Sequence, residues 1–244
     1  MCPEPQIKLD PHPVKQRLRA IRRGIYEHFG NARYTPRTSL NGLDEKLEKY
    51  LDFKNGVFIE AGANDGITQS NTYYLEKGKQ WTGLLVEAIP ELYLKCRAVR
   101  KSSKVYNCGL VPPDHPEMTL RMHFANLMSV ADGAMDSGQI KEHVQQGLEC
   151  QGLASTYEVV VPALTLASLV EECRLDRIDF LSLDVEGGEA GVLEGLNLRV
   201  HRPRLILVEA SHFSEVDDLL TSNRYRMIDK LTFHDYLYAD EFDR

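Results

Sequence analysis

The sequence of 244 residues predicts an α/β fold in which helices cover both faces of a mainly parallel sheet. Short apolar runs alternate with segments of helical periodicity over residues 57–108 and again over 165–220. Most of the apolar runs end at an acidic residue, where a turn into the next helix can begin. The 43% of hydrophobic residues is enough for one core in a chain of this length.

A basic segment precedes the alternation. Val14, Leu18, Ile21, Ile25 and Phe29 have helical spacing among several lysines and arginines, which predicts an amphipathic helix over 14–29. Its apolar stripe packs on the domain or on a second subunit, or it lies on an anionic membrane surface, and both interpretations stay open. We therefore divide the chain into an N-terminal basic helical extension, residues 1–42, and a domain over 43–244.

The strands of the sheet are expected where apolar runs are short and the helices where apolar residues recur every three or four positions. The predicted strands are Val57–Ile59, Trp81–Val86, Val105–Cys108, Ile178–Leu183 and Leu205–Val208. The predicted helices are Leu43–Leu51, Ser70–Lys77, Pro90–Arg100, Thr165–Cys173, Ala190–Leu196 and Val216–Leu220. Two last strands, Tyr225–Asp229 and Thr232–Leu237, are separated closely at Lys230, which predicts an antiparallel hairpin.

Residues 110–157 interrupt this rhythm with prolines, glycines and four of the six methionines. We predict a strand over Met118–Phe124, followed by an irregular or helical excursion. The methionines form a lid over an apolar acceptor or fill irregular packing.

A candidate binding site lies beyond the carboxyl ends of the strands, where ligands of open α/β sheets bind. The first strand runs into a turn over 60–66, in which Gly62 and Gly66 permit a sharp bend and a close approach of a ligand. Glu87 ends the second strand, 25 residues after Gly62, and its carboxylate suits the two hydroxyls of a ribose. Together these residues predict a cofactor that contains adenosine.

The charge of the turn indicates which cofactor. A pyrophosphate needs a glycine-rich turn without acids, whereas this turn has Asn64 at the third motif position and carries Glu60 and Asp65. Acidic groups favour the positively charged S-adenosylmethionine. A nicotinamide-dependent oxidoreductase stays as an alternative, as does an interaction module without catalytic activity.

A second set of acids follows the later strands. Asp184 and Glu186 are two residues apart, so both carboxylates lie on one face if the strand continues through them. Glu209 ends the next strand, and His212 follows it. These four residues are candidates for a general base, and the acids are candidates for binding the ammonium group of the cofactor. A divalent metal, if one is bound, has Asp184, Glu186 and Glu209 as candidate ligands. Alternatively, the acids cap the following helix and solvate the loop.

The segments FIEAGANDG, LLVEAIPE and IDFLSLDVEGGEAGVLEG resemble the FkbM family of S-adenosylmethionine-dependent methyltransferases, with similarity over residues 43–238. The resemblance implies a Rossmann-like, seven-stranded class I methyltransferase sheet whose last strand is antiparallel. It also implies O-methylation of a hydroxyl on a sugar, glycan or natural product, with residues 110–157 on the acceptor side. The Asn126-Leu127-Met128-Ser129 segment also matches the family, whereas Ser182 stands where many members have lysine.

Site residues follow from this resemblance by position. It implies that the cofactor is bound by Glu60, Gly62, Asn64, Asp65, Gly66, Ser70, Asn71, Thr72, Glu87, Ala88, Asn107, Cys108 and Asp184.

Composition excludes several other classes of protein. The longest apolar stretch, Val159–Leu164, has six residues, far fewer than the roughly 20 that span a bilayer. Residues 38–244 carry a net charge of −12, from 21 basic and 33 acidic residues, which argues against nucleic-acid binding. The five cysteines include no CxxC pair, which fits a reducing compartment and argues against a thiolate zinc site. We expect a cytoplasmic protein that acts on a small molecule or glycan, with an oligomer possible.

Overall fold

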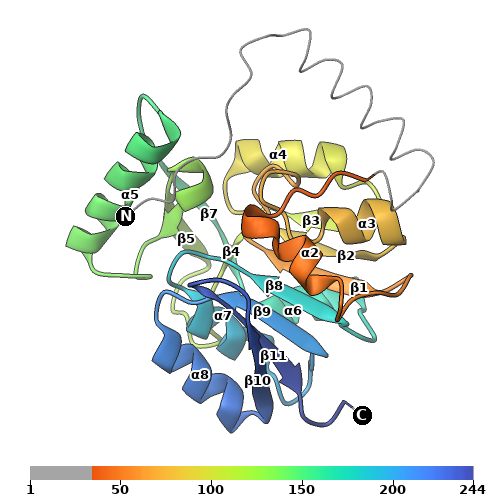
Figure 1. Cartoon of the computed structure of the whole chain (residues 1–244). Coiled ribbons are helices and arrows are strands. Elements are labelled where there is room, and N and C mark those ends of the chain that lie inside the picture. The colour runs from red at the N-terminus through yellow and green to blue at the C-terminus, as the bar shows by residue number, and fades with distance from the viewer. Residues whose placement is uncertain (1–34, 244) are drawn as a thin grey trace, which may run out of the picture.

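A seven-stranded sheet forms the centre of the computed structural model, which describes residues 35–243. Its strands are β1 (Val57–Ala61), β2 (Thr82–Val86), β3 (Lys104–Tyr106), β8 (Phe180–Leu183), β9 (Leu205–Glu209), β10 (Tyr225–Lys230) and β11 (Asp235–Asp240). They lie in the order β10-β11-β9-β8-β1-β2-β3 (Figure 1). Strands β3, β2, β1, β8 and β9 pair in parallel, and β11 is antiparallel to both of its neighbours. The predicted α/β class and antiparallel last strand are confirmed.

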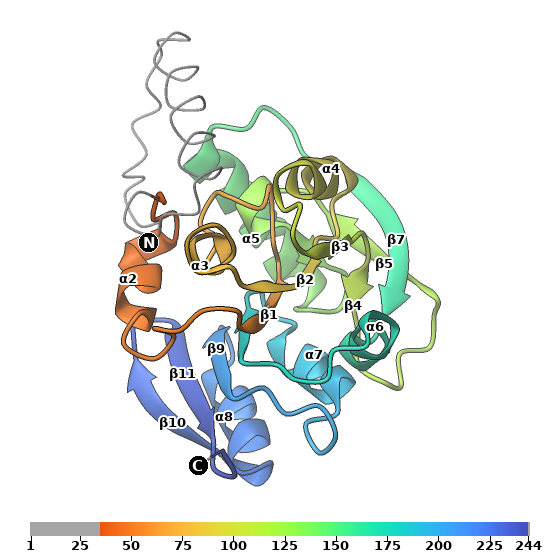
Figure 2. The ribbon, with the colours of Figure 1, turned by 90° about the vertical axis from the view of Figure 1, so that its right-hand side faces the viewer.

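In the part of the chain that the structure describes, three helices cover each face of this sheet. Helices α2 (Leu43–Leu47), α3 (Tyr73–Lys79) and α4 (Pro90–Val99) lie on one face, and α6 (Leu166–Cys173), α7 (Glu189–Leu196) and α8 (Phe213–Ser222) lie on the other (Figure 2). Side chains alternate along each strand, so Phe58 of β1 packs under the first group and Ile59 under the second. Because both faces are buried, the strands read as continuous apolar runs in the sequence.

Residues 110–157 contribute strands β5 (Thr119–His123) and β6 (Val130–Ala131) to a smaller second sheet. With β4 (Gly109–Leu110) and β7 (Glu158–Leu164), they lie in the order β4-β7-β5-β6. The short helix η3 (Asn126–Met128) and helix α5 (Ser137–Gln151) complete this part of the chain, which is green in Figure 1. Leu120, Met122 and Val161 pack on Ile89, so this sheet lies over the connection from β2 to α4. The predicted strand over 118–124 is confirmed as β5, whereas β7 was not predicted.

Several element boundaries differ from the prediction. Helix α3 begins at Tyr73 rather than Ser70, and α2 ends at Leu47, after which residues 48–50 form a turn. The predicted antiparallel hairpin of the last two strands is confirmed, but its connection is longer than the tight one predicted at Lys230, because β11 begins at Asp235 rather than at Thr232. Residues 231–234 form the turn, and Thr232 Oγ1 accepts hydrogen bonds from the backbone of His234 and Asp235. These bonds hold residues 232–235 in a turn, so the pairing of β11 with its neighbours begins only at Asp235.

The predicted N-terminal helix over 14–29 lies outside the described residues. Leu40–Gly42 form a short 3-10 helix, and Ser39 bridges to Gln69 in the loop after β1. Within residues 35–243, no helix is long and apolar enough to cross a membrane.

One buried arginine ties the first half of the sheet to its helices. Arg100, only 1% exposed, follows α4 and donates hydrogen bonds to Glu76 of α3 at 2.9 Å and to Glu60 of β1 at 3.2 Å. The same guanidinium donates to Thr72 Oγ1 at 2.7 Å. Burial raises the pKa of Glu76, but Arg100 and Lys77 outweigh it and hold that pKa below the ordinary value.

Replacing Arg100 by leucine should lower the free energy of unfolding by about 3–5 kcal/mol, because Glu60 would stay buried without its cation and Glu76 would keep only Lys77. Urea denaturation of the Arg100→Leu variant measures this loss. Arg97→Leu, on the exposed side of α4, is the matched control and should cost less than about 0.5 kcal/mol. Equal losses in the two variants would show that the buried cluster does not stabilise the fold.

Candidate active site

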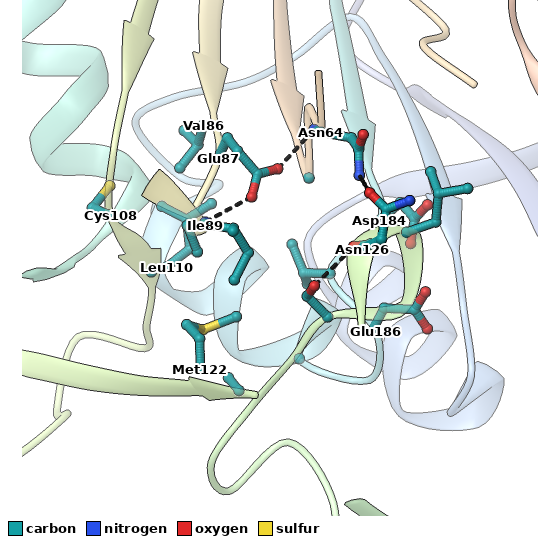
Figure 3. A pocket seen from close by; sticks show the side chains of 18 of the residues that line it. Asn64, Val86, Glu87, Ile89, Cys108, Leu110, Met122, Asn126, Asp184 and Glu186 are labelled. Carbon is teal, nitrogen blue, oxygen red and sulfur yellow. Dashed lines mark hydrogen bonds between the residues drawn. The ribbon is translucent and has the colours of Figure 1, made fainter. Parts of the chain in front are cut away.

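A pocket opens at the carboxyl ends of β1, β2 and β8 (Figure 3). The predicted residues Gly62, Asn64, Ser70, Glu87, Ala88, Cys108, Asp184 and Glu186 line it. Residues from the second sheet and its loops line the opposite side, among them Leu110, Leu120, Met122, Asn126, Leu127, Ser129 and Ala131. The pocket is therefore closed between the central sheet and the part of the chain that interrupts the α/β alternation.

The turn after β1 is shaped by its contact with the loop after β8. Gly62 has φ +85°, and a Cβ atom there would lie 1.8 Å from the carbonyl oxygen of Asp184. Only glycine allows this approach, which brings the two loops together at one wall of the pocket. Asp65 stabilises the turn further along, because its Oδ1 accepts hydrogen bonds from the backbone of Ile67 and Thr68. Asp65 and Gly66 themselves do not line the pocket.

Glu60 holds the entry to α3 rather than facing the pocket. Its buried carboxylate accepts hydrogen bonds from Ser70 Oγ at 2.9 Å, the Asn71 backbone at 3.0 Å and Thr72 Oγ1 at 2.7 Å. These bonds keep residues 70–72 out of the helix, which explains the later start of α3. Glu60, Asn71 and Thr72, which were predicted to bind a cofactor, do not line the pocket.

Ser182 also faces away from the pocket. It is buried in β8, and its Oγ accepts a hydrogen bond from Asn71 Nδ2 at 3.1 Å. The serine at this position therefore does not change the charge of the pocket wall.

Glu87 is fixed at the end of β2 by the backbone. One carboxylate oxygen accepts from the Asn64 amide at 2.7 Å and the other from the Ile89 amide at 2.7 Å (Figure 3). Each oxygen has a further lone pair for a ligand. Burial raises the pKa of Glu87 to about 7, although the two backbone bonds oppose the shift. Asn107 lies behind this residue and donates to the Glu87 and Ala88 carbonyls.

The acid loop after β8 does not continue the strand. Glu186 has φ +56° and Gly187 φ +100°, so the expectation that Asp184 and Glu186 share one face through strand alternation is wrong. Both side chains nevertheless line the pocket. Burial and the charges of neighbouring acids, first that of Glu209, raise the pKa of Asp184 well above its ordinary value and that of Glu186 to about 8.

Glu209 and His212 lie beside the pocket without lining it. Glu209 is half-buried at the end of β9, where burial and the charges of Asp235 and Glu189 raise its pKa to about 7. His212 is exposed at the start of α8. Over residues 35–243, no group of three or more His, Cys, Asp or Glu side chains has the arrangement of a metal site.

The second sheet supplies residues that the sequence alone did not place in the site. Asn126 has φ +53°, accepts from Asn64 Nδ2 at 3.4 Å and donates to Gln151 of α5 at 2.9 Å. The match of residues 126–129 to the family was the available signal for Asn126. For β7, whose pairing places β5 against the pocket, the signal was the run Val159–Leu164.

All the ionisable side chains that line the pocket among the described residues, apart from the Cys108 thiol, are carboxyl groups. Glu87, Asp184 and Glu186 line it, and no lysine or arginine does among the residues that the structure describes. On the side of Glu87 the wall is apolar, with Ile89, Leu110 and Met122. Such a pocket suits a ligand with an apolar ring at one end and positive charge at the other, and it disfavours a diphosphate.

Comparison with known proteins gives one strong match. The family model described as "Methyltransferase FkbM domain" matches residues 60–231. No curated protein gives a match.

The chain is also similar to solved structures at low identity. These include a TehB-like SAM-dependent methyltransferase from Corynebacterium glutamicum, with 11% identity over 93% of this chain and 97% of that one, at a TM-score of 0.41. Aeropyrum pernix fibrillarin with natively bound S-adenosyl-L-methionine has 13% identity over 76% and 67%, at a TM-score of 0.40. Burkholderia thailandensis 1,6-didemethyltoxoflavin-N1-methyltransferase has 13% identity over 94% and 90%, at a TM-score of 0.36. Similarities this distant carry no inference about substrate.

Replacing Gly62 by alanine should disrupt the junction between the turn and the acid loop. Gly133 is the matched control, since its φ is +84° but a Cβ there would meet nothing within 4 Å. The backbone cost of about 1–2 kcal/mol is shared by both variants, whereas overpacking adds about 1–3 kcal/mol at position 62 alone. Chemical denaturation measures the difference, and equal losses in both variants would contradict the contact.

Proposed function

The chain belongs to the FkbM family of S-adenosylmethionine-dependent methyltransferases, and from this premise we propose that it methylates a hydroxyl oxygen of a small neutral acceptor. A sugar, a glycan or a natural product is the class of acceptor that the family resemblance implies. The observation that carries the proposal is the pocket itself, where three carboxyl groups face one space without a lysine or arginine among the described residues.

The residues of the pocket fit the cofactor. The Glu87 carboxylate is held by two backbone amides, and its remaining lone pairs can accept hydrogen bonds from the two ribose hydroxyls. Ile89, Cys108, Leu110 and Met122 offer an apolar wall for a flat purine ring. Asp184 and Glu186 lie at the other end, where they would attract the positive groups.

The chemistry divides between cofactor and protein. When bound, S-adenosylmethionine supplies a methyl group on a sulfonium sulfur, whose C–S bond breaks as the bond to the acceptor oxygen forms. The protein must align the acceptor oxygen and receive the proton of its hydroxyl. Asp184 and Glu186 are the candidates for receiving it, because both line the pocket. The pKa of Glu186, raised to about 8, suits proton transfer near neutral pH.

The nature of the acceptor is inferred from the same wall. Asn126, Leu127 and Ser129 add uncharged groups to the pocket, and among the described residues the lining offers no lysine or arginine to bind a phosphorylated or otherwise anionic compound. A neutral hydroxylated acceptor therefore agrees best with the pocket. Peripheral membrane contact, oligomer formation and a cytoplasmic location stay predictions from the sequence.

Asp184→Asn and Glu186→Gln should separate catalysis from binding. We expect the variant that lacks the proton acceptor to transfer methyl groups about 10²–10⁴-fold more slowly. Its affinity for S-adenosylhomocysteine should stay within a few-fold. Mass spectrometry of products from a panel of neutral glycosides and polyols measures transfer, and calorimetry measures affinity.

Glu194→Gln, on the exposed side of α7, is the control and should change neither quantity. Loss of cofactor affinity in parallel with transfer would assign Asp184 and Glu186 to binding instead. Cofactor binding without transfer to any acceptor would favour an interaction module.

Cofactor affinity should depend on pH through Glu87. Ribose hydroxyls donate to the ionised carboxylate, so binding lowers a pKa that burial has raised to about 7. Affinity for S-adenosylhomocysteine should therefore be full above pH 8 and fall by up to about tenfold per unit below pH 7. In calorimetry from pH 6 to 8.5, Glu87→Gln should weaken binding at high pH and flatten the profile. A wild-type affinity that is constant over this range would contradict the role of Glu87.

A further inference from the structure

Helix α5 lies outside the seven-stranded core, yet one of its side chains contacts the acid loop. His143 Nε2 lies 3.4 Å from Glu186 Oε2 and 3.1 Å from the carbonyl oxygen of Met128. The imidazole is mostly shielded, with 17% of its side chain exposed, and the Glu186 side chain is 22% exposed. This contact joins the second-sheet region to the wall of the pocket that holds the candidate bases.

We propose that His143 is a positioning residue that fixes the Glu186 carboxylate toward the acceptor hydroxyl. The inference rests on the proposed function and deepens it, since it assigns Glu186 rather than Asp184 as the group that is held for proton transfer. In this arrangement His143 touches neither cofactor nor acceptor and acts only through Glu186.

The direction of the hydrogen bonds follows from the acceptor groups. A carbonyl oxygen can only accept, so the Nε2 atom that faces Met128 carries the proton. Nε2 also lies 3.4 Å from Glu186 Oε2, so the imidazole contacts this carboxylate beside the hydrogen bond that it donates to Met128. Burial lowers the pKa of His143, which favours a neutral imidazole that donates without adding a positive charge to the pocket.

Glu186 needs such a contact to stay in place. Its φ of +56° is unfavourable for a residue other than glycine, so contacts from neighbouring residues must hold the loop in this conformation. Glu209 and Glu189 also repel its charge. The imidazole of His143, 3.4 Å from Oε2, restrains the carboxylate that these acids would displace.

Helix α5 is held firmly enough to position this donor. A Cβ at Gly147 would lie 2.9 Å from Ala125 Cβ and 3.1 Å from Met128 Cβ, so the helix packs closely on η3. Gln151 donates to the Ala125 carbonyl at 2.8 Å and accepts from Asn126 Nδ2 at 2.9 Å. Asp136 and Gln139 form a capping box that fixes the start of the helix.

The contact can be tested without an acceptor. In full-length protein labelled with ¹⁵N-histidine, the His143 imidazole signals, assigned by their loss in His143→Gln, should report a proton on Nε2. Glu186→Gln should shift these signals, whereas Glu194→Gln, the exposed matched control, should leave them unchanged. Signals that do not respond to Glu186→Gln would overturn the proposal.

Transfer assays test the consequence. With an acceptor from the neutral glycoside panel, His143→Leu should lower kcat about 100-fold, the cost of a misplaced reacting group, and leave cofactor affinity unchanged. His143→Gln keeps an N–H donor and should retain activity within a few-fold. His123→Gln, which removes an imidazole paired with Asp132 in the second sheet, is the control and should be as active as wild type.

The two proposals fail in different ways. Equal loss of kcat and of thermal stability in His143→Leu and His143→Gln would show a structural role and overturn the positioning role. If the wild-type protein transfers methyl groups to no member of the panel, the proposed O-methylation fails. In that case the ¹⁵N signals alone decide whether His143 holds Glu186.

Discussion

The site depends on one constraint: three carboxyl groups face a pocket that no lysine or arginine lines within residues 35–243. Burying an acid raises its pKa or requires a positive partner, and Glu87, Asp184 and Glu186 all show raised pKa values. A cationic nucleoside would supply that partner when it binds. The same groups would disfavour a dinucleotide with two phosphates.

The fold maintains this arrangement by two different contacts. Gly62 lets the turn after β1 touch the carbonyl of Asp184, which sets the width of the pocket between two parallel strands. On the other face, Arg100 neutralises Glu60, whose carboxylate orders the entry to α3. Acids that look alike in the sequence thus have opposite surroundings, since Glu60 is paired with Arg100, whereas no cation pairs with Asp184 among the residues that the structure describes.

The sequence predicted the central sheet well because apolar runs and acids mark its strands directly. Glu87 ends the run Leu84–Val86, and its place in the pocket follows from parallel pairing alone. Contacts distant in the sequence were not predictable. The turn before Asp235 depends on the Thr232 side chain. The orientation of Glu186 depends on a left-handed backbone conformation that the hydrophobic periodicity of the sequence does not indicate. His143 reaches the site only because α5 packs on η3.

Calorimetric titration of the full-length protein with S-adenosylmethionine, S-adenosylhomocysteine and NAD tests the central claim most directly. We predict that both nucleosides bind with measurable heat and raise the melting temperature, while NAD does neither. A protein that binds NAD, or that gives no heat and no thermal shift with either nucleoside, would contradict an acidic pocket built for a cationic cofactor.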